Sequence, residues 1–74
     1  MASHAVHNEV AYAFHSLFCM VPSLRAPAQQ RASYHLFKSE VFEAWAAIEP
    51  SAAAQALQLA AKSRREAHAI AADY

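Results

Sequence analysis

The hydrophobic residues of this chain recur with the period of an α-helix in three successive segments. In the first segment, about residues 4–20, they fall on one side of a helix, while Asn8, Glu9 and Ser16 fall outside that side. The apolar side consists of Val6, Val10, Ala13, Phe14, Leu17, Phe18, Met20 and Val21. This pattern predicts an amphipathic helix that packs its apolar side against a core.

The second segment, residues 27–49, has two apolar stripes instead of one. The stripe of larger side chains consists of Tyr34, Phe37, Val41, Ala44, Trp45 and Ile48. We expect Phe37 and Trp45 to be central core residues. The other stripe has the 4-3-4-3-4 spacing of a heptad seam and is mostly small: Ala28, Ala32, His35, Ser39, Phe42 and Ala46. Small residues let another helix approach closely, so we expect this seam to contact a partner.

Prolines divide the segments, and the chain contains no glycine. Pro22 ends the first helix, Pro27 suits the first position of the second, and Pro50 ends the second. Ser51 then suits the N-cap of a third helix that runs to about residue 73. The large apolar residues of that helix are Leu57, Leu59, Ile70 and Tyr74. The sequence therefore predicts a small all-α domain over residues 1–74, with helices 2 and 3 as an antiparallel hairpin and helix 1 packed across it.

Composition limits how such a domain is stabilised. A chain of 74 residues forms a small core, and its one cysteine, Cys19, rules out an internal disulfide. Hydrophobic residues make up 57% of the chain, which is more apolar surface than one small core consumes, so we expect a homo-oligomer. Six basic and six acidic residues cancel, which argues against nucleic acid or a membrane as partner. With no secretory signal and no long apolar run, we expect a cytoplasmic protein.

Five histidines are the one compositional feature with chemical potential. His4 and His7, at i and i+3, have a spacing that lets two imidazoles share a metal ion. His15 and Cys19 are one helical turn apart, as in a minimal nucleophile pair. Both spacings are also common for ordinary surface histidines and for a buried structural thiol, and we favour those interpretations.

Charged residues indicate no second chemistry. Glu40 and Glu43 share a face of the second helix, where we expect them to be solvated. The only basic cluster is Lys62, Arg64 and Arg65, and Glu66 follows it directly. Binding of nucleic acid usually needs a broader basic face.

These observations predict a non-catalytic domain without a cofactor, which binds a protein partner, itself or another, as an adaptor, inhibitor or regulatory subunit. The expected partner-binding residues are Ala32, His35, Leu36, Ser39, Phe42 and Ala46. Leu36 is included because it lies on neither stripe of its helix. The alternative is a helical protein that binds a metal or haem through histidines such as His4 and His7.

Overall fold

The computed structural model describes the backbone of residues 2–72 and the side chains of residues 9–72. Three α-helices follow one another along the chain: α1 (Ala2–Cys19), α2 (Ala28–Ile48) and α3 (Ala53–Ala72). A short 3₁₀ helix, η1 (Pro50–Ala52), directly precedes α3. Within residues 2–72 there is no strand, and the predicted all-α class with three helices is confirmed.

Pro27 directly precedes α2, which begins at Ala28, one residue later than predicted. Its φ of −55° and ψ of 146° lie outside the helical region, so it caps the helix instead of being its first residue. The first backbone bond of α2 runs from the N–H of Arg31 to the carbonyl of Pro27, at 3.1 Å. A proline suits this place because its missing N–H has no partner to lose at a helix start.

The break between α2 and α3 is as short as Pro50 predicts. Glu49 is extended, with φ −129° and ψ 84°, because the following proline ring disfavours the α conformation. Ser51 is not the N-cap of α3, as the sequence suggested. It lies within η1, and α3 begins at Ala53 once that tighter turn has redirected the chain.

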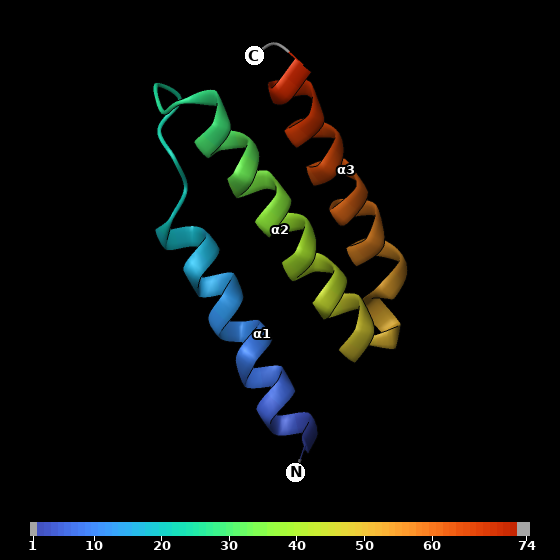
Figure 1. Cartoon of the computed structure of the whole chain (residues 1–74). Helices are drawn as coiled ribbons and strands as arrows, with labels where there is room; N and C mark the ends of the chain where they lie inside the picture. Colours follow the sequence, from blue (N-terminus) through green and yellow to red (C-terminus); the bar gives the residue numbers. More distant parts are fainter. Residues whose placement is uncertain (1, 73–74) are drawn as a thin grey trace.

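The three helices form a flat layer with α2 in the middle (Figure 1). The chain measures 44 × 23 × 13 Å along its principal axes, and the shortest extent is close to the diameter of one helix. Helices α2 and α3 form the predicted antiparallel hairpin, and α1 packs on that hairpin through α2. In the part of the chain that the structure describes, α1 does not approach α3. Both broad sides of the layer are therefore uncovered.

Small residues bring α2 and α3 close together. The buried residues of α3 have the spacing 4-3-4 and are Ala56, Ala60, Ser63 and Ala67. On α2, Ser39 is 1% exposed. The two buried serines satisfy their hydroxyls within their own helices: Ser39 Oγ donates to the carbonyl of Leu36 at 2.6 Å, and Ser63 Oγ to that of Leu59 at 2.9 Å. The hairpin is thus held by close contact of small groups, which bury little apolar area each.

Larger side chains hold α1 against α2. Val10, Leu17 and Val41 are buried in this contact. Next to them, the ring of Phe14 meets Phe42 and Trp45 edge to face, with centroids 5.7 Å and 5.8 Å apart. The hydroxyl of Tyr34 on α2 also donates to the carbonyl of Leu17, at 3.2 Å. The apolar side predicted for the first helix is therefore confirmed at Val10, Phe14 and Leu17.

Two expectations about the core are wrong. Phe37 and Trp45 are half-buried and not central, because α2 has neighbours on its two edges but no helix over either broad side. On α1 and just after it, Phe18, Met20 and Val21 were expected in the core, yet Phe18 is 79% exposed and the other two are more than half exposed. A single layer of helices cannot bury an apolar stripe as wide as the one on this helix. The side chain of Val6 lies outside the described residues.

Candidate protein-interaction surface

The seam of small residues on α2 lies against α3 of the same chain. Ser39 is buried there, and His35 faces Glu66 of α3. Ala32 and Ala46 are half-buried along the same stripe. The close helix that this seam admits is therefore α3, and a second protein at the seam stays a prediction.

The other two residues proposed for partner binding differ from these four. Phe42 belongs to the seam by spacing, but its ring packs on Phe14 of α1. Leu36 is exposed. The six residues therefore do not form one continuous surface: four follow the contact with α3, Phe42 turns to α1, and Leu36 points toward α3 but is 42% exposed.

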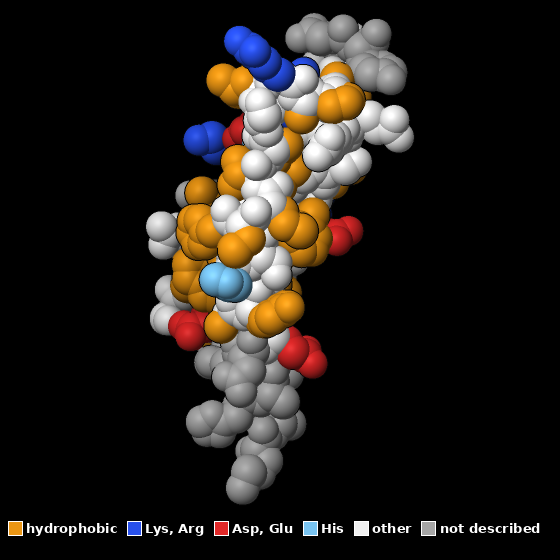
Figure 2. All heavy atoms as spheres, turned by 90° about the vertical axis from the view of Figure 1, so that its left-hand side faces the viewer, with side chains coloured by type: hydrophobic (Ala, Val, Ile, Leu, Met, Phe, Trp, Pro, Cys, Tyr) orange, Lys and Arg blue, Asp and Glu red, His pale blue; other side chains and the backbone are white. Residues whose placement is uncertain are grey.

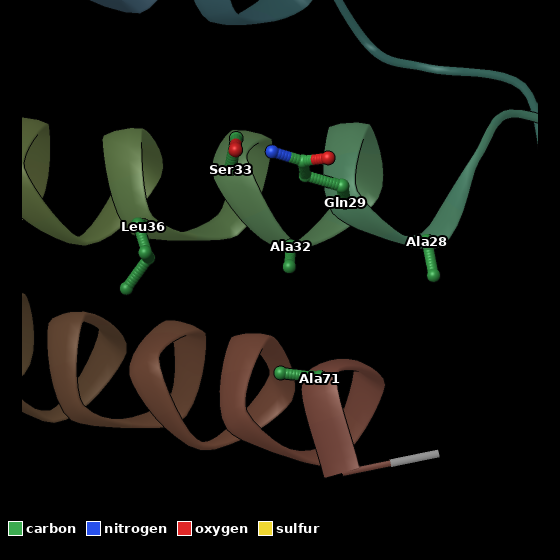
Figure 3. A pocket seen from close by; sticks show the side chains of 6 residues that line it. All are labelled: Ala28, Gln29, Ala32, Ser33, Leu36 and Ala71. Carbon is green, nitrogen blue, oxygen red and sulfur yellow. The ribbon is translucent and has the colours of Figure 1, made fainter. Parts of the chain in front are cut away.

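Leu36 borders a shallow apolar cavity of about 170 Å³ at one end of the seam (Figure 3). Ala28, Ala32 and Leu36 point from α2 toward α3, and Ala71 of α3 lines the opposite side. Gln29 and Ser33 complete the lining. The cavity exists because three facing side chains are methyl groups, which are too short to fill the space between the helices at this end.

A second cavity, of about 240 Å³, lies among the connection after α1, the start of α2, and Ile70 of α3. Arg31, Tyr34 and His35 are its polar lining residues. Arg31 is held by a bond from its Nε to the carbonyl of Ala26 at 3.1 Å. Burial raises the pKa of the Tyr34 hydroxyl.

His35 is the one histidine with a perturbed environment among the described side chains. Its Nδ1 is buried and lies 3.5 Å from Oε2 of Glu66, an ion-pair separation in which no hydrogen bond forms. Burial lowers the pKa of His35, and the positive charges of Lys38 and Arg31 lower it further, while Glu66 acts in the opposite direction. The imidazole is therefore neutral near pH 7, and protonating it works against folding.

The most exposed large apolar side chains are on α1 and in the connection that follows it. Tyr12 is 73% exposed, Phe18 79% and Leu24 92%. Met20 and Val21, close to them in the chain, are 54% and 59% exposed. Figure 2 views the molecule from the side of α1 and shows hydrophobic side chains spread over it. Monomeric proteins rarely leave so many large apolar groups together in water.

Sequence reasoning missed this surface because it assigned Phe18, Met20 and Val21 to the core and gave Tyr12 and Leu24 no role. The distribution of charged residues along the sequence was the signal that could have indicated this surface. Between Glu9 and Arg25 no Asp, Glu, Lys or Arg occurs, so neither side of this stretch carries the charges that mark an ordinary solvated face.

The candidate chemical groups predicted from the sequence are spread over α1 and the hairpin. His15 Nε2 lies 3.6 Å from Cys19 Sγ, and both residues are exposed, so the thiol is not the buried one expected from the sequence. Glu43 pairs with Arg64 across the hairpin. Among the described side chains, no three His, Cys, Asp or Glu residues gather closely enough to hold a metal ion. The side chains of His4 and His7 lie outside the described residues, and the metal- or haem-binding alternative stays a prediction.

Comparison with protein-family models, curated proteins and solved structures finds no match to this chain. None of the described helices combines the length and the apolar character needed to cross a membrane.

Proposed function

We propose that this chain is a non-catalytic protein-interaction domain that acts in the cytoplasm as an adaptor, inhibitor or regulatory subunit. It binds its partner through apolar helix surfaces. One observation carries the proposal: among the described side chains, the close contact of α2 with α3 buries mainly alanines and serines, while Tyr12, Phe18 and Leu24 are mostly in water.

The distribution of apolar side chains supports this use. In a domain that functions alone, the large apolar residues usually supply the core and the small ones fill gaps. Here alanine and serine make the closest helix contact, and both broad sides of the layer are uncovered. A partner placed on one of those surfaces removes large side chains from water at little cost, because the helices that carry them are already formed.

The test compares the chain with a variant whose exposed surface is polar. In the variant, Phe18→Ser and Leu36→Ser replace two exposed apolar residues. Circular dichroism must first show equal helicity for both proteins. Both proteins are then immobilised at equal density and exposed to extract of the native host. The parent should retain a protein, or a further copy of itself, that the variant does not retain.

Equal retention by both proteins, or retention of nothing by either, would refute an interaction function through these surfaces. The matched control changes two residues that are already polar and exposed and that line neither cavity, Gln58→Ser and Gln30→Ser. This control should bind like the parent, which ties any loss to the apolar side chains and not to the number of substitutions.

A further inference from the structure

The cavity of about 240 Å³ has a polar wall on α2 and apolar walls from two other segments. Arg31, Tyr34 and His35 are spaced i, i+3 and i+4, so they share one face of that helix. The apolar lining comes from the connection after α1 and from α3: Val21, Pro22, Leu24 and Ile70. Figure 1 shows these segments at the end of the layer where α2 begins. We call this space the Arg31 cavity.

Arg31 brings a positive charge to the cavity that no carboxylate of the described chain neutralises. Its Nε donates to the carbonyl of Ala26 at 3.1 Å, which fixes the side chain. Within residues 9–72, neither ion pair involves Arg31, and no hydrogen bond engages its terminal Nη atoms. The N–H groups on these two atoms are therefore left for a ligand, and their planar arrangement matches the two oxygens of a carboxylate.

The surroundings of Arg31 favour an anion. The Tyr34 hydroxyl donates to the carbonyl of Leu17, and the imidazole of His35 is neutral near pH 7. Among the described residues, no Asp or Glu lines the cavity. Most Lys and Arg side chains visible in Figure 2 lie in its upper part, the end of the molecule where α2 begins in Figure 1. Because Arg31 is half-buried, its attraction for an anion is screened less than that of a charge in open solvent.

The apolar lining defines the rest of the ligand. Leu24 is 92% exposed and Val21 59%, so a hydrocarbon chain that covers them removes both side chains from water. The volume is below the roughly 300–1,000 Å³ of pockets for drug-sized ligands, which limits that chain to a few carbons. We propose that the Arg31 cavity binds a small monocarboxylate, with the carboxylate on Arg31 and a short hydrocarbon chain against Val21, Leu24 and Ile70.

Titration of the full chain with three small probes, followed by ¹H–¹⁵N nuclear magnetic resonance at neutral pH, tests both halves of this ligand. Hexanoate should shift the amide signals of residues around the cavity and saturate in the millimolar range, as suits so small a ligand. Hexanamide keeps the chain without the charge, and acetate keeps the charge without the chain. Each should bind at least about tenfold more weakly than hexanoate. Equal binding of hexanamide, or shifts spread over the whole chain, would overturn the proposal.

Matched variants test the two walls separately. Arg31→Gln should weaken hexanoate binding at least about tenfold, whereas Arg25→Gln, which removes the same charge from an exposed residue outside the cavity lining, should stay within about twofold of the parent. Leu24→Ser should weaken binding about threefold or more, and Leu57→Ser, at an exposed leucine of α3, should not. Circular dichroism checks that each variant keeps its helicity, and Leu24 is exposed enough to be replaced without loss of the fold. Hexanoate binding that survives in both Arg31→Gln and Leu24→Ser would overturn the site.

His35 reports where the ligand lies. The charges of Lys38 and Arg31 lower the pKa of His35 and that of Glu66 raises it. A carboxylate bound in the cavity adds a further negative charge next to the ring, so the midpoint of the His35 ring-proton titration should move to higher pH when hexanoate is saturating. Hexanamide should leave the midpoint unchanged. A midpoint that hexanoate does not move would place the anion outside the cavity and overturn the proposal.

A carboxylate beside a short hydrocarbon group belongs to free acids and also to the C-terminus of a protein that ends in an apolar residue. N-acetylleucine imitates such a C-terminus, and N-acetylleucinamide is its uncharged control. Binding of N-acetylleucine at least about tenfold tighter than hexanoate supports the site and assigns it to a protein C-terminus, and weaker binding supports it as a site for a free acid. Binding of neither hexanoate nor N-acetylleucine would overturn the site.

This inference goes beyond the proposed function and does not depend on it. Phe18 and Leu36, which carry the test of that function, do not line the Arg31 cavity. A chain that binds no hexanoate can still retain a host protein, and a chain that retains no protein can still bind hexanoate. The two proposals therefore fail in different experiments.

Discussion

Replacing Ala60 with leucine should separate the two helices of the hairpin. Ala60 is 1% exposed and lies in the middle of the seam between α2 and α3. Its methyl group is buried between the helices, so an isobutyl group has no space unless α3 moves outward. Overpacking of this kind typically costs about 1–3 kcal/mol.

That cost is large for this protein. Domains of this size have a net stability of roughly 3–5 kcal/mol, so the variant should lose a large fraction of its free energy of unfolding. Movement of α3 also pulls Ala56 and Ser63 away from α2, because all three lie on one rigid helix face. We therefore expect the upper half of the range.

Urea unfolding followed by far-ultraviolet circular dichroism measures the change. All variants are compared at one protein concentration, because association shifts apparent stability. The control is Ala69→Leu, which makes the same chemical change at an exposed position of α3. Leucine is nearly as good a helix former as alanine, so the control should stay within about 0.5 kcal/mol of the parent. If Ala60→Leu is as stable as Ala69→Leu, the seam is not closely packed and the account of the hairpin is wrong.

Three further outcomes are expected. Ser63→Ala should change the free energy of unfolding by less than about 0.5 kcal/mol, because the lost hydroxyl bonded only within its own helix. Ser63→Val should cost about 1 kcal/mol or more by overpacking, and urea melts of the two variants compare these values. Trp45→Ala should cost about 2–3 kcal/mol, less than the 3–5 of a fully buried ring, and a loss below about 1 in the same melt would contradict its packing on Phe14. The pKa of His35 is lower in the folded protein than in the unfolded chain, so the unfolded chain binds more protons than the folded protein as pH falls through about 6.5. The free energy of unfolding should therefore decrease in that range and level off below the folded pKa. His35→Gln should show a smaller decrease between pH 7.5 and 5.5, and an equal decrease would assign the effect to other groups.

Local features of the sequence predicted the helices and their ends to within a few residues. Proline acts on its own neighbours: the extended Glu49 and the start of α2 directly after Pro27 follow from ring geometry, whatever the rest of the chain does. The tight turn of η1 was not predicted, because Ser51 suits a helix cap and a 3₁₀ turn equally well.

The surface proposed for partner binding was harder to predict. The spacing of Ala32 and Ser39 correctly indicated a close helix contact, but spacing does not say whether the second helix belongs to the same chain. Phe18 shares the apolar side of Leu17 by periodicity, yet only Leu17 is buried. Periodicity marks a side that can be buried and leaves open how much of it a neighbour covers.

The sequence by itself determined that the chain forms three helices, that prolines separate them, and that the middle helix has two sides able to pack. Each of these depends on interactions between residues close in the chain. Only the tertiary structure decided that α3 takes the seam of small residues, that α1 takes the aromatic side, and that α1 and α3 do not meet. The physical reason is that burial is shared among helices: once α1 and α3 occupy the two edges of α2, no helix of the described chain remains to cover the broad sides. Tyr12, Phe18 and Leu24 are consequently left in water.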